Sequence, residues 1–277
     1  MKKIIVPIDF SETSEFALQV AASIAKKQKA ELLVLHMLEM AGNFLSKTDG
    51  EQQAAAAYFF KISEQKMEKY LNKPYLKGVK VTPIIKHYKV FSEINEVALN
   101  NEVQLIVMGS HGVSGVKEVF IGSNTEKVIR HSNIPVLVIK HQLEDVSFDI
   151  GIFACDFSME NIKPYQEAKT MFKKLGTQLY LLYVNTPYEQ FKSSNEIDEK
   201  IQKFLKKADG GLMNLHDVHK ISDYSVEKGI INFGLNVGAD VVAIPTHGRK
   251  GFSHFVEGSI TEDISNHASF PVMTFKI

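Results

Sequence analysis

The chain has one cysteine, no excess of either charge and no apolar run long enough to cross a membrane. Cys155 has no second cysteine to pair with, so no internal disulfide holds the fold together. Lys and Arg number 32, as do Asp and Glu, and this balance predicts no broad attraction to nucleic acid or to an anionic membrane. The apolar stretch before Asp9 is five residues long, too short for a signal peptide. We therefore expect a cytoplasmic protein with neither a nucleic-acid nor a membrane partner.

Catalytic motifs are also scarce. No glycine-rich loop ends in Lys-Ser or Lys-Thr, which excludes the ordinary hydrolytic P-loop. His111 and His247 lie in glycine-containing loops, but no acidic partner or nucleophile stands at a recognisable spacing, so we interpret them as loop or ligand-contact residues. His216 and His219 have metal-like spacing, yet residues three apart on a strand point to opposite faces. We predict no catalytic residue and no metal site, and we interpret Cys155 as a small buried hydrophobe rather than a redox-sensitive thiol.

The most informative motif that is present begins with the apolar run 104–108, which predicts a buried parallel strand. Gly109 and Gly112 follow it, and glycine lets the backbone turn sharply and approach a ligand closely. Ser123 then opens a helix, with Glu126 three residues later in the pattern of a capping box. The amides of a helix N-terminus attract anions. Together these features predict a phosphate site, although each alone could simply end a strand or cap a helix.

The glycines of this segment follow the spacing Gly-x2-Gly-x9-Gly-Ser, which ends at Gly122 and Ser123. This spacing resembles the nucleotide loop of the universal stress protein family. A first strand that ends in Pro7 and Asp9, and a last strand at 134–139, extend the resemblance. It covers essentially the whole chain, because the pattern occurs twice. The resemblance implies a stress-response or signalling protein that binds an adenine nucleotide, ATP or AMP, which Mg²⁺ can accompany.

The repeat is visible in the motifs themselves. The Asp-Phe-Ser that begins at Asp9 recurs at Asp156, an offset of 147, whereas the later motifs recur at an offset of 136. The second copy is therefore shorter somewhere between its first and fourth strands. A period of about 140 residues indicates two whole domains rather than a solenoid. We place a first domain at 1–143 and a second domain, with the altered glycine loop, at 146–277.

Alternating strands and helices predict an α/β fold in which each half is a doubly wound, five-stranded parallel sheet flanked by helices. The resemblance implies the strand order 3-2-1-4-5 in each. We expect first-half strands at 3–8, 31–38, 79–86, 104–108 and 134–139, helices at 11–28, 51–72, 92–100 and 123–130, and second-half strands at 150–154, 178–184, 217–222, 241–244 and 272–275.

Ligands bind open parallel sheets beyond the carboxyl ends of the strands, at the switch point of the strand order. Asp9 would meet the ribose or the adenine edge there, or cap the following helix. The resemblance implies that the main chain near Met37 meets adenine, with the Met37 side chain in the core. The residues that we assign to the first nucleotide site are Pro7, Asp9, Met37, Met108, Gly109, His111, Gly112, Gly122, Ser123 and Asn124.

The second copy departs from the pattern at Pro245, which replaces the glycine at 109. Proline removes a backbone donor where an amide would meet phosphate, so we expect a weaker second site. Tyr88 also stands where some family members have a glycine after strand three, which leaves the shape of the adenine side open. The residues of the second site are Asp156, His247, Gly248, Gly258, Ser259 and Ile260.

Each half ends in a β-forming segment, 135–139 and 271–275, at an edge of its predicted sheet. An exposed apolar edge is a liability unless it is covered. We predict that the two final strands pair with each other, which makes the chain one compact unit and mimics an isologous dimer. Whether two such chains also form a homodimer stays open.

Two other functions stay open. Slow ATP hydrolysis or phosphoryl transfer would need a positioned water and a metal, for which Asp9 and Ser123 are the candidates. A ligand-free scaffold would assemble through its edge strands.

Overall fold

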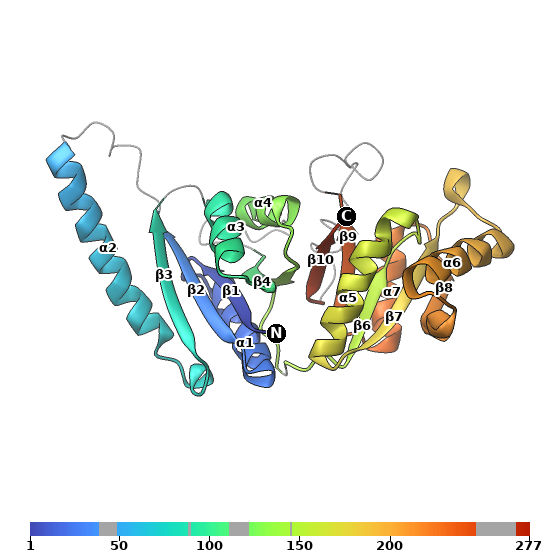
Figure 1. The fold of residues 1–277 in the computed structure, drawn as a ribbon, viewed down its shortest axis with the longest axis horizontal. Coiled ribbons are helices and arrows are strands. Elements are labelled where there is room, and N and C mark those ends of the chain that lie inside the picture. Colours follow the sequence, from blue (N-terminus) through green and yellow to red (C-terminus); the bar gives the residue numbers. More distant parts are fainter. Residues whose placement is uncertain (39–48, 88–89, 111–121, 145, 248–269) are drawn as a thin grey trace.

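The computed structural model describes residues 1–38, 49–87, 90–110, 122–144, 146–247 and 270–277. In these residues the strands form one ten-stranded sheet of order β3-β2-β1-β4-β5-β10-β9-β6-β7-β8 (Figure 1). The strands are β1 (Lys3–Ile8), β2 (Glu31–Leu38), β3 (Val81–His87), β4 (Leu105–Gly109), β5 (Val136–Ile139), β6 (Ile150–Ala154), β7 (Gln178–Asn185), β8 (Val218–Ser222), β9 (Val241–Thr246) and β10 (Val272–Lys276).

The helices are α1 (Glu12–Gln28), α2 (Asp49–Leu71), α3 (Val90–Asn100), α4 (Ser123–His131), α5 (Ile162–Leu175), α6 (Ser194–Asp209) and α7 (Val226–Val237). No helix in the described part of the chain is long and apolar enough to span a bilayer.

Both halves have the predicted doubly wound architecture. The first half runs β3-β2-β1-β4-β5 and the second, read from its outer edge, runs β8-β7-β6-β9-β10, so the implied order 3-2-1-4-5 is confirmed twice. All neighbours within a half are parallel. The shorter second copy is explained in part by its helix α6, which has 16 residues where α2 has 23.

The two halves meet through an antiparallel pair of strands. Met273 of β10 lies opposite Leu137 of β5, and Thr274 lies opposite Val136. Lys276 adds a contact between the halves, because its Nζ donates to the carbonyl of Arg130 at 2.6 Å. The predicted pairing of the two final strands is confirmed, and each strand covers the other's edge.

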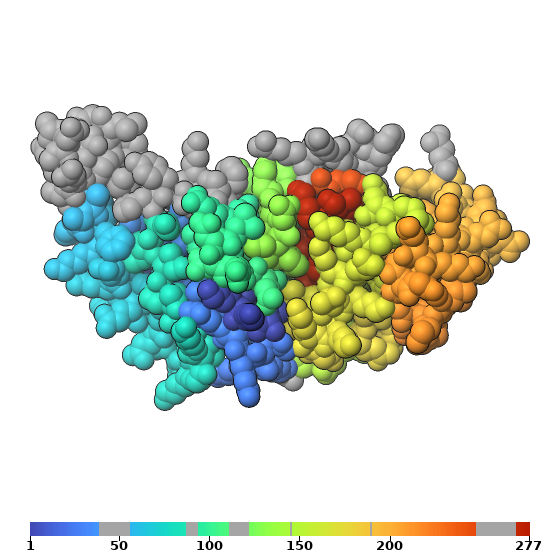
Figure 2. Space-filling model, viewed as in Figure 1, coloured from blue at the N-terminus to red at the C-terminus, as the bar shows by residue number. Residues whose placement is uncertain are grey.

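The core is shared on one face of the sheet and divided on the other. A single cluster of buried side chains runs through both halves on the face that carries α1, α2, α5 and α6. On the opposite face, α3 and α4 cover a separate cluster in the first half and α7 covers another in the second. At the shared face Lys27 of α1 donates to the carbonyl of Val146 at 3.0 Å. Figure 2 shows the halves packed against one another along this junction.

Truncating the junction is expected to destabilise the whole chain. Met273 is fully buried and Met213 is 85% exposed, so the two methionines form a matched pair. Met273→Ala should lower the free energy of unfolding by about 2–5 kcal/mol, because it leaves a cavity between the halves. Met213→Ala should change it by less than about 0.5 kcal/mol. Urea denaturation of both variants checks this, and equal stabilities would contradict the structural importance of the junction.

Candidate functional site

The candidate site lies where the carboxyl ends of β1 and β4 are neighbours. Asp9 directly follows β1, and Ser110 directly follows β4. Residues 111–121 lie outside the described part of the chain, but the residues on either side of them are bonded to each other, since the Gly122 amide donates to the Ser110 carbonyl at 2.6 Å. The Thr125 hydroxyl donates to the Gly109 carbonyl at 2.9 Å. These two bonds hold the N-terminus of α4 at the end of β4, in the switch-point crevice.

The N-terminus of α4 differs from the sequence prediction. Gly122 is the N-cap residue, and no side chain there caps the helix. The capping box predicted for Ser123 and Glu126 is wrong, because Ser123 is already the first helical residue and Glu126 pairs with Arg130 instead. The amides of the first turn therefore have no side-chain cap at the N-cap position, an arrangement that suits an anion.

The structure gives a packing reason for the glycine at position 109, and the sequence did not show this reason. A Cβ at this position would lie 2.8 Å from the backbone carbon and oxygen of Thr13 and 3.0 Å from the Ser14 nitrogen. The first turn of α1 thus packs directly on the end of β4. Gly109 is needed for this close approach, whether or not a ligand also approaches it.

The Asp-Phe-Ser motif forms the same unusual turn in both halves. Phe10 has φ +66° and Phe157 has φ +56°, a left-handed conformation that costs a residue with a side chain about 1–2 kcal/mol. The Asp9 Oδ1 accepts the Ser11 amide at 3.0 Å and the Asp156 Oδ1 accepts the Ser158 amide at 2.9 Å. The turn thus places an aspartate directly after the first strand in each half, although Ser11, and not Asp9, is the residue that caps α1.

Aromatic packing compensates for this backbone strain. In the first half, the Phe10 ring lies 4.4 Å from the His36 ring and 5.1 Å from the Tyr70 ring, between centroids. In the second half, Phe157 is fully buried and lies 5.2 Å from Phe204. Burial raises the pKa of Tyr70 to about 12, so its hydroxyl stays protonated at neutral pH.

Lysines from the helix after the second strand reach both turns. The Lys66 Nζ lies 4.2 Å from the centroid of the Phe10 ring, and the Lys200 Nζ lies 3.0 Å from the Asp156 Oδ2. The sequence prediction missed both residues. An offset of 134 relates Lys66 to Lys200, and the same offset relates the packed rings of Tyr70 and Phe204; a search for this third offset could have found them.

The remaining predicted residues of the two sites, together with Tyr88, fall into three groups. Pro7 lies on β1, and the buried side chains of Met37 and Met108 lie on β2 and β4, so Met37 is a core methionine as expected. Asn124 is exposed in the first turn of α4. The residues outside the described part of the chain are Tyr88, His111, Gly112, Gly248, Gly258, Ser259 and Ile260.

The two histidines with metal-like spacing were expected to lie on one strand, but they do not. His216 belongs to a short 3₁₀ turn, Met213–Asp217, and only His219 lies on β8. No group of three potential metal ligands of the His, Cys, Asp or Glu type occurs among the residues with described coordinates.

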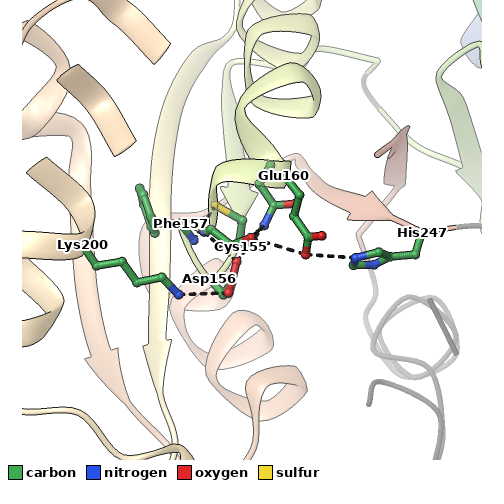
Figure 3. A network of polar contacts seen from close by, with 8 residues as sticks. Cys155, Asp156, Phe157, Glu160, Lys200 and His247 are labelled. Carbon is green, nitrogen blue, oxygen red and sulfur yellow. Dashed lines mark hydrogen bonds and ion pairs between the residues drawn. The ribbon is translucent and has the colours of Figure 1, made fainter. Parts of the chain in front are cut away.

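The second-half crevice contains a connected polar network (Figure 3). The Asp156 carboxylate accepts from Asn161 Nδ2 at 2.7 Å, in addition to Ser158 and Lys200. Burial alone would raise the pKa of Asp156, but hydrogen bonds from Ser158 and the contact with the charged Lys200 hold it below its ordinary value. The Glu160 Oε1 lies 3.0 Å from the His247 Nε2.

Cys155 adjoins this network without the properties of a reactive thiol. Burial raises the pKa of its thiol, and its sulfur accepts the Phe157 amide at 3.4 Å. A thiol that stays protonated is a poor nucleophile, which argues against the redox-sensitive alternative, although Cys155 is half-buried and not fully buried as expected.

The fold and the paired crevices agree with the comparison to known families. The model of the universal stress protein family matches the chain twice, at residues 1–140 and 152–276. The chain belongs to the universal stress protein family and contains two copies of its domain in tandem.

Individual relatives match one copy each. A universal stress protein of Methanocaldococcus jannaschii is 34% identical over 159 residues, which span 51% of this chain and 96% of the relative. Universal stress protein YxiE of Bacillus subtilis is 34% identical over 145 residues, 50% of this chain and 98% of the relative. A crystal structure of a universal stress protein from Archaeoglobus fulgidus covers 99% of this chain and 96% of its own, with 24% identity and a TM-score of 0.63. That likeness shows the tandem fold.

Adding a methyl group to Gly109 is expected to strain the contact between α1 and β4. Gly109→Ala should cost about 1–3 kcal/mol of stability, because the new Cβ meets backbone that cannot rotate away. Gly211→Ala is the matched control, since a Cβ there meets nothing within 4 Å. Thermal and urea unfolding of both variants measure the difference. If Gly109→Ala is as stable as the control, the packing explanation for this glycine is wrong.

The Asp156 network predicts a pH dependence of stability. Because the pKa of Asp156 is lower in the folded chain, its contribution is present above the unfolded pKa of about 3.9 and is lost as pH falls through the folded value. Asp156→Asn should therefore destabilise the protein at pH 7, and its deficit should shrink in increasingly acid buffer. Urea denaturation at a series of pH values tests this. A deficit that stays constant down to the lowest pH would contradict the assigned protonation state.

Proposed function

We propose that this chain binds an adenine nucleotide, ATP or AMP, in the crevice of its first half, and acts as a nucleotide-binding stress-response or signalling protein rather than primarily as a catalyst. One observation carries this: Asp9 and the N-terminus of α4, which has no side-chain cap, follow two neighbouring parallel strands. Negative phosphate oxygens are stabilised at such a helix start. We assign this site to the domain of residues 1–143 and keep 146–277 as the second domain.

The proposed contacts follow from the placement of the residues. The backbone amides of Gly122, Ser123 and Asn124 at the start of α4 would hold phosphate, and the Asp9 carboxylate would hold the ribose. The ends of the three central strands would line the adenine side through the main chain of Pro7, Met37 and Met108. Gly109 would lie beside the phosphates, and His111 and Gly112 would add contacts to them. Mg²⁺ can accompany ATP by binding its phosphates.

The described groups around Asp9 favour binding over catalysis. Tyrosine is ordinarily protonated at neutral pH, and burial raises the pKa of Tyr70 further, to about 12, so Tyr70 is not suited to act as a general base. His36 Nδ1 lies 3.0 Å from the Ile8 carbonyl oxygen, and its ring packs on Phe10. Both side chains support the turn that positions Asp9.

Gly122→Asp is expected to abolish most nucleotide binding. The new carboxylate would stand at the start of α4, where like-charge repulsion of several kcal/mol opposes phosphate, so the affinity should fall by about 100-fold or more. Gly122→Ala is the matched control, because the backbone at φ −59° and ψ 142° accepts any residue. Titration calorimetry with ATP and with AMP measures both variants.

Three results would redirect the assignment. Unchanged affinity in Gly122→Asp would show that nucleotide binds elsewhere. Absence of binding by the unaltered chain would favour a scaffold without ligand. ATP turnover by the unaltered chain that disappears in Gly122→Asp would favour the hydrolytic alternative.

A further inference from the structure

We propose that Glu160 excludes nucleotide phosphates from the second-half crevice, so that the tandem chain binds nucleotide in its first half alone. This inference rests on the function proposed above. It assigns the difference between the halves to a charged side chain in the crevice, in addition to the replacement of Gly109 by Pro245.

The internal repeat gives Glu160 a defined counterpart. The offset of 147 that relates Asp9 to Asp156 pairs Thr13 with Glu160. The structure supports this register, because the residue after each aspartate has the same left-handed backbone. A neutral hydroxyl side chain in one half is thus replaced by a carboxylate in the other.

This position lies at the crevice in both halves. In the first half the backbone of Thr13 contacts Gly109 at the end of β4. In the second half Glu160 belongs to the 3₁₀ turn Met159–Asn161, and its carboxylate reaches His247, which directly follows β9. Figure 3 shows the Glu160 carboxylate between Asp156, which follows β6, and His247, which follows β9.

The charges in this crevice oppose a polyanion. Asp156 is held in its ionised form and is bound by Lys200, so that lysine is already engaged with a carboxylate. Glu160 adds a second carboxylate, which contacts His247 at 3.0 Å and accepts from the Ser158 hydroxyl at 3.5 Å. A phosphate placed at the ends of β6 and β9 would approach both carboxylates, and such like-charge juxtaposition is unfavourable.

Binding stoichiometry tests the inference. Titration calorimetry with ATP on the full-length chain should give one site per chain for the unaltered protein. Glu160→Thr, which installs the first-half residue, should create a second site, and Glu160→Gln should do so more weakly. Glu144→Gln, which removes the same charge from an exposed position in the connection between the halves, should leave one site.

A second arm isolates the second half. In a Gly122→Asp background, added Glu160→Thr should restore ATP binding by about 10-fold or more in affinity, equivalent to at least about 1.4 kcal/mol. Circular dichroism confirms that each variant is folded. One site per chain in Glu160→Thr at millimolar ATP, with no recovery in the double variant, would overturn the role of Glu160. Two sites in the unaltered chain would overturn it as well, whereas no site at all would refute the proposed function itself.

Discussion

The antiparallel pairing of β5 with β10 is the interaction on which the rest of the structure depends. It joins the last strand of each half, so that neither presents an apolar edge to solvent, and it merges two five-stranded sheets into one. One buried cluster then extends across both halves on the face that carries α1 and α5. Each half keeps its own switch-point crevice, because the strand order inside it is unchanged by the pairing.

The two crevices share the same left-handed backbone turn but differ in the charged side chains around it. Phe10 and Phe157 both adopt a left-handed backbone that packing stabilises, and each turn presents an aspartate. Beyond this turn the second half contains an ion pair from Lys200 and the carboxylate of Glu160. The aromatic packing that supports the turn is thus common to both halves, whereas the charged side chains around the turn differ.

Much of this organisation was predictable, because repeats, strand periodicity and edge-strand physics depend on local sequence. The junction followed from the apolar character of the two final strands. The helix cap at Gly122 was missed because a capping pattern shifted by one residue looks alike in sequence. Among the described helices a capping box does form at Ser193 and Glu196. The contacts of Lys200 and Glu160 were missed because only tertiary structure brings α6, the turn after β6 and the end of β9 together.

Hydrogen–deuterium exchange of the full chain, with and without saturating ATP, tests the central claim most directly. The claim is that one nucleotide binds at the ends of β1 and β4, in the first half. It predicts slower amide exchange at residues 9–14 and 122–126, with exchange at residues 155–161 unchanged. Slowing confined to residues 155–161, or no change anywhere at saturating ATP, would contradict it.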